Sequence, residues 1–65
     1  MTIAQTRRAF LKAIRDNVRA RASQKGVVMT KECLDEIVLQ QATDALCGDS
    51  AKTLKIRLDQ LLDMC

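Results

Sequence analysis

Residues 30–46 read TKECLDEIVLQQATDAL, and this stretch decides the fold. Thr30 is a favourable helix N-cap, and the apolar residues that follow it recur at helical spacing. On a helical wheel these residues spread over about half of the circumference. They are Leu34, Ile37, Val38, Leu39, Ala42, Ala45 and Leu46. So broad an apolar face predicts a central helix over residues 31–46 that packs against more than one neighbour.

A first helix is predicted over about residues 3–24. Thr2 and Gln5 have the spacing of a capping box, and Gly26 is a favourable left-handed stop. The apolar positions of this helix form one stripe that is expected to be buried. They are Ile3, Phe10, Leu11, Ile14, Val18 and Ala22. The linker residues 27–29, VVM, are too apolar for a solvated loop and are expected to tuck under the domain.

A third helix is predicted over about residues 51–64. Gly48 ends the central helix, and Asp49 or Ser50 caps the next one. The apolar stripe of the third helix consists of Ala51, Leu54, Leu58, Leu61, Leu62 and Cys65. Ile56 lies on the opposite side, where it is either an ordinary exposed residue or a subunit contact.

Together these elements predict a single all-α domain over residues 1–65, built as a small three-helix arrangement. A chain of 65 residues hides only about 60% of the surface of its unfolded form, so its stability as a monomer is marginal. Small proteins often compensate by oligomerisation. A self-sufficient monomer and a homodimer both fit the sequence, and we favour the homodimer.

Positive charge is concentrated at the start of the chain. Residues 1–26 carry seven of the eleven Lys and Arg residues. Four of the seven recur at spacings of four, three and four, which places them on one face of a helix. They are Arg8, Lys12, Arg15 and Arg19. This basic face is the feature of the sequence that points to an external partner.

Two kinds of partner fit the basic face. It matches the phosphates of a DNA duplex or a folded RNA, which predicts salt-dependent binding of nucleic acid with little sequence specificity. It equally matches an acidic surface of another protein, and the chain would then be an adaptor or inhibitor of a bacterial or phage type. The face could also be purely structural, since Glu32, Asp35 and Glu36 of the central helix could neutralise part of it.

Two further arginines fall inside the apolar stripe of the first helix. Arg7 and Arg21 each lie within about 20° of Ile14 on the helical wheel. At the ends of the helix their side chains can extend past the core to water. Otherwise they mark a place where the stripe meets another chain, as arginine often does in interfaces. We therefore list Arg7, Arg21 and Ile56 as candidate interface residues.

The composition argues against an enzyme. The chain has no histidine, the usual general base and a common metal ligand. Cys33, Cys47 and Cys65 are too scattered for structural zinc, and reduced thiols suit the cytoplasm. Asp59 and Asp63 share a helix face that is expected to be solvated, and so short a chain is not expected to enclose a large pocket. We therefore predict no catalytic residue, no metal, no cofactor, no small-molecule substrate and no membrane span.

Overall fold

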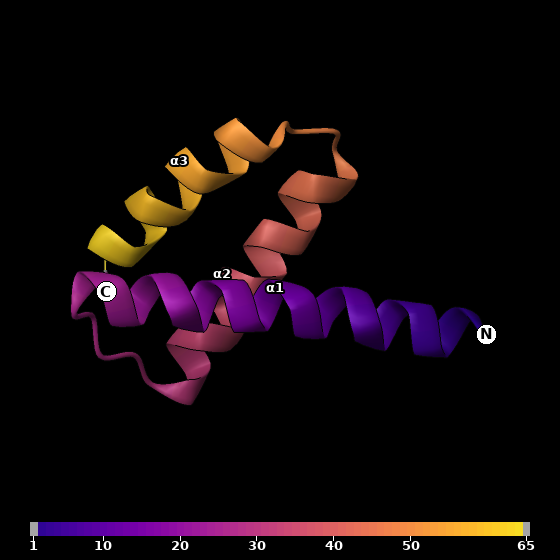
Figure 1. Cartoon of the computed structure of the whole chain (residues 1–65), viewed down its shortest axis with the longest axis horizontal. Helices are drawn as coiled ribbons and strands as arrows, with labels where there is room; N and C mark the ends of the chain where they lie inside the picture. Colours follow the sequence, from indigo (N-terminus) through magenta and orange to yellow (C-terminus); the bar gives the residue numbers. More distant parts are fainter. Residues whose placement is uncertain (1, 65) are drawn as a thin grey trace.

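The computed structural model describes residues 2–64, which form three α-helices and no strand (Figure 1). The helices are α1 (Ile3–Lys25), α2 (Lys31–Leu46) and α3 (Ala51–Asp63). The all-α prediction is therefore confirmed, with helix ends within one residue of those expected. α2 packs against both α1 and α3, which confirms it as the central helix.

The helix ends follow the predicted capping chemistry. The Oγ1 atom of Thr2 accepts a hydrogen bond from the backbone N–H of Gln5 at 3.2 Å. In return, the Oε1 atom of Gln5 accepts one from the backbone N–H of Thr2 at 3.1 Å. Thr30 and Ser50 cap α2 and α3 through equivalent hydroxyl contacts. Gly26 ends α1 at a φ of 70°, in the left-handed region that favours glycine.

The core lies where the second half of α1, the face of α2 and the second half of α3 meet. α1 contributes Val18 and Ala22, and α3 contributes Leu58 and Leu62. Between them lie the α2 residues Leu34, Ile37 and Val38. Ile14, Val27, Met29, Cys33 and Leu61 pack around this cluster and are partly buried.

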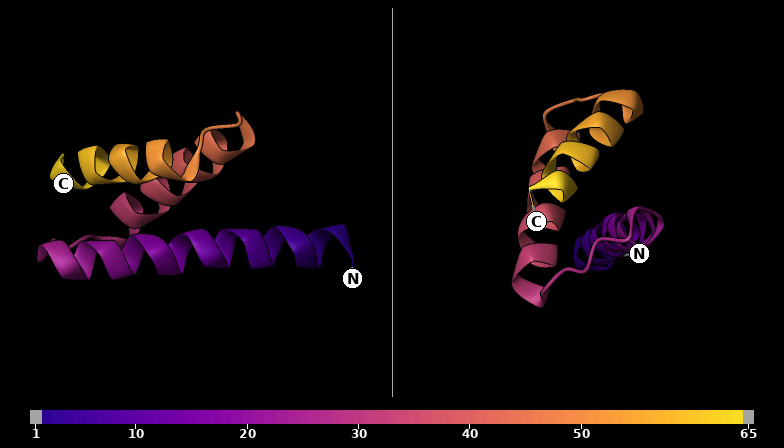
Figure 2. Two further views of the ribbon diagram at one scale, coloured as in Figure 1. Left: turned by 45° about the horizontal axis from the view of Figure 1, so that its top comes forward. Right: turned by 90° about the vertical axis from the view of Figure 1, so that its left-hand side faces the viewer.

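The first half of α1 stays outside the core, which corrects the predicted burial of its whole apolar stripe. Ile3 is 81% exposed, and Phe10 and Leu11 are each 37% exposed. Every residue from 3 to 13 is exposed, and we call this segment the arm. At 1.5 Å per residue α1 is about 35 Å long, close to the longest dimension of the molecule, 36 Å. α2 and α3 are too short to cover it, so the arm extends past them (Figures 1 and 2).

Two smaller expectations about burial are wrong as well. On α2, Leu39 is 67% exposed and Leu46 is 80% exposed. The two neighbouring helices do not cover the full width of the α2 apolar face, so its far edge remains at the surface. In the linker, Val27 and Met29 pack against the core but Val28 is 95% exposed. Inward and outward side chains alternate here, as along an extended chain.

Candidate functional site

The four residues of the predicted basic face lie on one continuous helix. α1 runs without interruption from Ile3 to Lys25, so the spacing of the four cations holds them on one side. We call this surface the basic ridge, and it consists of Arg8, Lys12, Arg15 and Arg19. Arg8 and Lys12 belong to the arm, whereas Arg15 and Arg19 lie over the packed half of α1. Along the helix axis the ridge extends for about 16 Å, at 1.5 Å per residue.

One cation of the ridge is paired with the neighbouring helix. The Nη2 atom of Arg15 lies 2.9 Å from the Oδ1 atom of Asp35 on α2. The two side chains are 39% and 46% exposed, so water and salt screen the pair and its contribution to stability is small. The predicted neutralisation by α2 is thus confirmed for Asp35. Within residues 2–64, Glu32 and Glu36 make no ion pair with the ridge.

The other three cations of the ridge lie at the surface. Arg8, Lys12 and Arg19 are exposed, and among residues 2–64 none of them has an acidic group within 4.0 Å. Arg19 lines a shallow hollow together with Lys31, at the N-terminus of α2. Lys31 was not among the predicted site residues, because sequence spacing relates residues of one helix and not of two. This second cation, beside the positive end of a helix dipole, extends the basic surface beyond α1.

Two cations at the C-terminal end of α1 form ion pairs with α3. The Nε atom of Arg21 lies 2.8 Å from Oδ1 of Asp59, and its Nη2 atom donates to Oδ2 at 3.1 Å. Lys25 Nζ lies 2.7 Å from Oδ1 of Asp63 and donates to the Asp59 carbonyl at 3.3 Å. The expected solvated surface is therefore wrong for Asp59, whose side chain is 32% exposed, and holds for Asp63, whose side chain is 69% exposed. Their spacing of four residues lets both carboxylates reach cations of α1, and the two ion pairs link α3 to α1.

The pair between Arg21 and Asp59 also shifts the acidity of both groups. The hydrogen bond from Arg21 lowers the pKa of Asp59, and this effect outweighs partial burial, which acts in the opposite direction. The same hydrogen bond raises the pKa of Arg21. Both groups are therefore held in their charged forms. The guanidinium of Arg21, predicted as a candidate interface group, already has a partner in its own chain.

The other two candidate interface residues are at the surface. Arg7 lies on the exposed arm and has no ion-pair partner among the described residues. Ile56 is 53% exposed on α3. Both remain available to a partner, and nothing in the structure assigns one to them.

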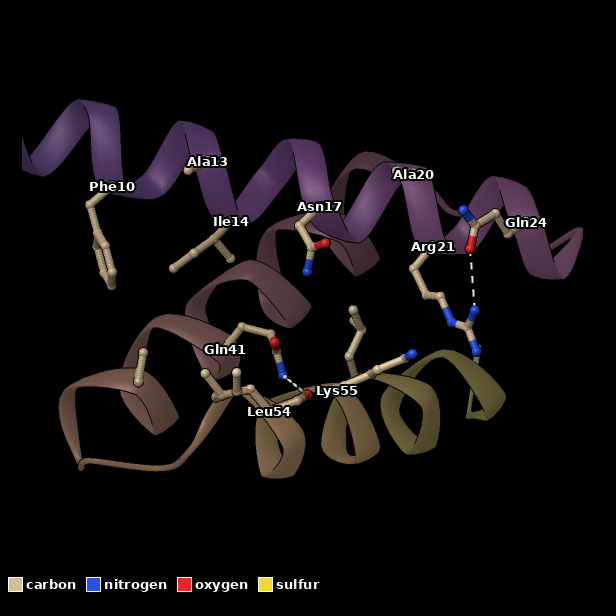
Figure 3. Close-up of a pocket in the computed structure, with 13 residues that line it drawn as sticks. Phe10, Ala13, Ile14, Asn17, Ala20, Arg21, Gln24, Gln41, Leu54 and Lys55 are labelled. Carbon is tan, nitrogen blue, oxygen red and sulfur yellow. Dashed lines mark hydrogen bonds between the residues drawn. The ribbon is translucent and has the colours of Figure 1, made fainter.

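A groove of about 620 Å³ lies between the three helices (Figure 3). It is larger than we expected of so short a chain, and it is open on one side. Phe10, Ile14 and Asn17 of α1 point toward it from one wall. On the opposite side the Nε2 atom of Gln41, a residue only 5% exposed, donates to the carbonyl oxygen of Leu54 at 3.3 Å. This bond links α2 to α3 beneath the groove, and no spacing in the sequence indicates it.

Other kinds of site are not formed by the described residues. Within residues 2–64 no group of three Cys, Asp or Glu side chains is placed to hold a metal ion, and Cys33 and Cys47 are free. None of the helices in that range has the length and apolar character needed to cross a membrane. Cys65, predicted to extend the α3 stripe, lies outside the described residues.

Comparison with known proteins gives no relative from which a function could be transferred. No protein-family model, no curated protein and no solved structure matches this chain. Inferences about function therefore rest on the basic ridge and the groove themselves.

Proposed function

We propose that this protein is a small, non-enzymatic regulator that binds the phosphates of nucleic acid through the basic ridge. The observation that carries the proposal is the position of Arg8 and Lys12. Both lie on an exposed arm, without an ion-pair partner in residues 2–64, while the cations at the other end of α1 are paired with α3. Unpaired cations on a projecting helix can approach a polyanion without first breaking internal contacts.

The geometry of the ridge suits a phosphate backbone more than a base edge. Its cations are spaced about 5–6 Å apart along a helix, and a DNA duplex presents one negative charge per about 1.7 Å of its axis. Such contacts orient a protein on the nucleic acid but carry no sequence information. Arg15 can join them by exchanging Asp35 for a phosphate, because its present pair is exposed and weak. We therefore propose salt-sensitive binding with low sequence specificity.

The salt dependence of duplex binding tests this proposal. Arg8→Gln with Lys12→Gln removes two ridge cations, and Arg57→Gln with Lys52→Gln removes the same two types from exposed positions of α3. For a DNA duplex, the slope of log affinity against log salt concentration should become shallower by about 1.8 in the first double variant. The second should keep the slope of the unmodified protein. Absence of duplex DNA or RNA binding at low salt would refute the proposal.

A second candidate function is supported by a different observation. The arm carries exposed apolar residues beside its cations, with Ile3 81% exposed and Phe10 37% exposed. A mixed apolar and basic helix face also fits an acidic protein surface, which is the adaptor or inhibitor alternative. Poly-glutamate distinguishes the two, because it offers carboxylates without the phosphate spacing of a duplex. Binding to poly-glutamate as tight as to a duplex, at equal charge concentration, would favour the protein partner.

We place this activity in the cytoplasm and in a homodimer. The free thiols of Cys33 and Cys47 support a reducing compartment, since oxidising ones favour disulfides in small domains. A homodimer would present two basic ridges to one nucleic acid, which increases the number of phosphate contacts. The small size of the chain and its exposed apolar arm support this assembly.

A further inference from the structure

The groove has the character of a helix-binding surface. About 620 Å³ in volume, it is bounded by all three helices and is open on one side (Figure 3). Its walls include small side chains, which allow close approach of another helix, and larger apolar ones, which exclude water. These are Ala13, Ala45 and Ala51 together with Ile14, Leu54 and Leu58.

The arm is an apolar helix segment without a covering partner. Ile3, Phe10 and Ile14 follow one another at spacings of seven and four residues, so they lie along one side of α1. Phe10 belongs to the arm and also lines the groove (Figure 3). The apolar side of the arm and the apolar lining of the groove are therefore one continuous surface.

The surface area of the chain is large for its mass. Its accessible surface is 4881 Å², whereas a folded monomer of 7.3 kDa is expected to expose about 4,200 Å². The excess of about 700 Å² is close to the roughly 800 Å² that each partner buries in a standard protein interface. The projecting arm and the open groove account for this extra accessible surface area. A partner covering both would bring the molecule to the compactness of ordinary folded proteins.

We propose that the occupant of the groove is the arm of a second copy of this chain. In a two-fold dimer each arm lies in the groove of the other copy, and the continuous surface around Phe10 is covered on both copies by the same contact. A foreign helix in the groove would leave Ile3 at the tip of the arm exposed. The arm is about 17 Å long at 1.5 Å per residue, so it reaches across a neighbouring groove without unfolding.

The charges of the two surfaces determine how this dimer responds to salt. The arm carries Arg7, Arg8 and Lys12 and no acidic residue, and the groove is lined by Lys55. Arg21 also lines the groove, but Asp59 neutralises it. The contact is therefore apolar with like charges at its edge, and screening should strengthen it. Nucleic acid binding has the opposite salt dependence, so the dimer and the proposed function can fail independently.

Sedimentation of matched variants tests the dimer. The unmodified protein should have a mass of about 14.6 kDa, twice that of the chain, and should associate more tightly as salt increases. Ile3→Glu alters a residue that is 81% exposed, and it should raise the dimer dissociation constant at least tenfold. Ile56→Glu places the same change on an exposed residue outside the groove and should leave that constant unchanged.

The groove side is tested in the same way. Ala13→Arg fills the groove from an exposed position of α1. Because Ala9, one turn earlier, belongs to the docked arm, the control is instead Leu39→Arg, at a residue of α2 that is 67% exposed and outside the lining. Ala13→Arg should separate the copies and Leu39→Arg should not. In a mixed sample of two isotope labels, methyl contacts between Ile3 of one copy and Ala51 of the other should appear. A monomeric mass at about 1 mM protein, or dissociation by Ile56→Glu rather than Ile3→Glu, would overturn the proposal.

Discussion

The two halves of α1 have the same helical geometry but different relations to the rest of the molecule. Residues 14–25 bury Val18 and Ala22, and their cations Arg21 and Lys25 bind carboxylates of α3. The arm buries none of its residues, and its cations have no ion-pair partner among residues 2–64. One half thus stabilises the fold, while the other is available to an external partner.

Inserting a carboxylate into each half of α1 should give the largest difference in stability between the two halves. Val18 is fully buried, so Val18→Asp places an unpaired charge in the core. Such a charge destabilises by several kcal/mol, and a chain of this size has only about 3–10 kcal/mol of stability. We expect Val18→Asp to unfold the protein.

Ile3→Asp is the matched change in the arm, and in the monomeric chain it should alter the free energy of unfolding by less than about 0.5 kcal/mol. Circular dichroism during urea unfolding at low micromolar concentration measures both variants. Comparable losses of stability in the two would contradict the division of α1 into a packed and a projecting half.

Removing helix caps should have smaller effects on stability, and these should again differ between the core and the arm. Thr30 caps α2, whose residues form the middle of the core, so Thr30→Ala should reduce the free energy of unfolding by about 1 kcal/mol. Thr2 makes an equivalent cap at the tip of the arm. Thr2→Ala should fray the first turn locally, accelerating amide exchange there without changing global stability. Equal shifts of the urea midpoint would show that the arm unfolds together with the core.

Acid should reduce the stability of the protein by protonating Asp59, which pairs with the packed half of α1. We expect this effect to be smaller than those of the core substitution and of cap removal. The pKa of Asp59 is lowered in the folded protein, so its contribution is fully present above the unfolded value, near 3.9, and is lost as pH falls through the folded value. The melting temperature should therefore fall below about pH 4. Asp59→Asn should flatten this fall while lowering stability at neutral pH.

Asp16→Asn is the control for Asp59→Asn. Asp16 is exposed on α1 and makes no ion pair among the described residues, so its replacement should leave the acid dependence unchanged. Identical pH profiles for Asp59→Asn and the unmodified protein would contradict a stabilising role for the pair with Arg21.

The helices could be predicted from the sequence because their signals are local. The hydroxyls of Thr2, Thr30 and Ser50 and the glycine at 26 act within a few residues, and periodicity shows which residues share a face. Periodicity does not show how far along a helix its neighbours reach. For that reason the sequence predicted burial of Ile3. Ile3 is exposed because α2 and α3 are shorter than α1 and do not reach it.

The candidate site was predictable in composition but not in its pairing. Helical spacing identified the four cations of the basic ridge, and charge alone suggested that Glu32, Asp35 and Glu36 could neutralise part of it, without indicating the pair of Asp35 with Arg15. The pairs of Arg21 with Asp59 and of Lys25 with Asp63 join residues 38 positions apart. They form because α3 lies against the C-terminal end of α1, and no spacing in the sequence indicates that position. The groove was missed for the same reason, since it exists only between three crossing helices.

Backbone amide shifts during titration with a short DNA duplex test the central claim most directly. At low salt, with the protein labelled with ¹⁵N, we expect the largest shift changes along the basic ridge from Arg8 to Arg19 and at Lys31. The amides of Lys52 and Arg57, cations on α3, should change little. Changes centred on α3, or no changes at low salt, would contradict binding of nucleic acid by the basic ridge.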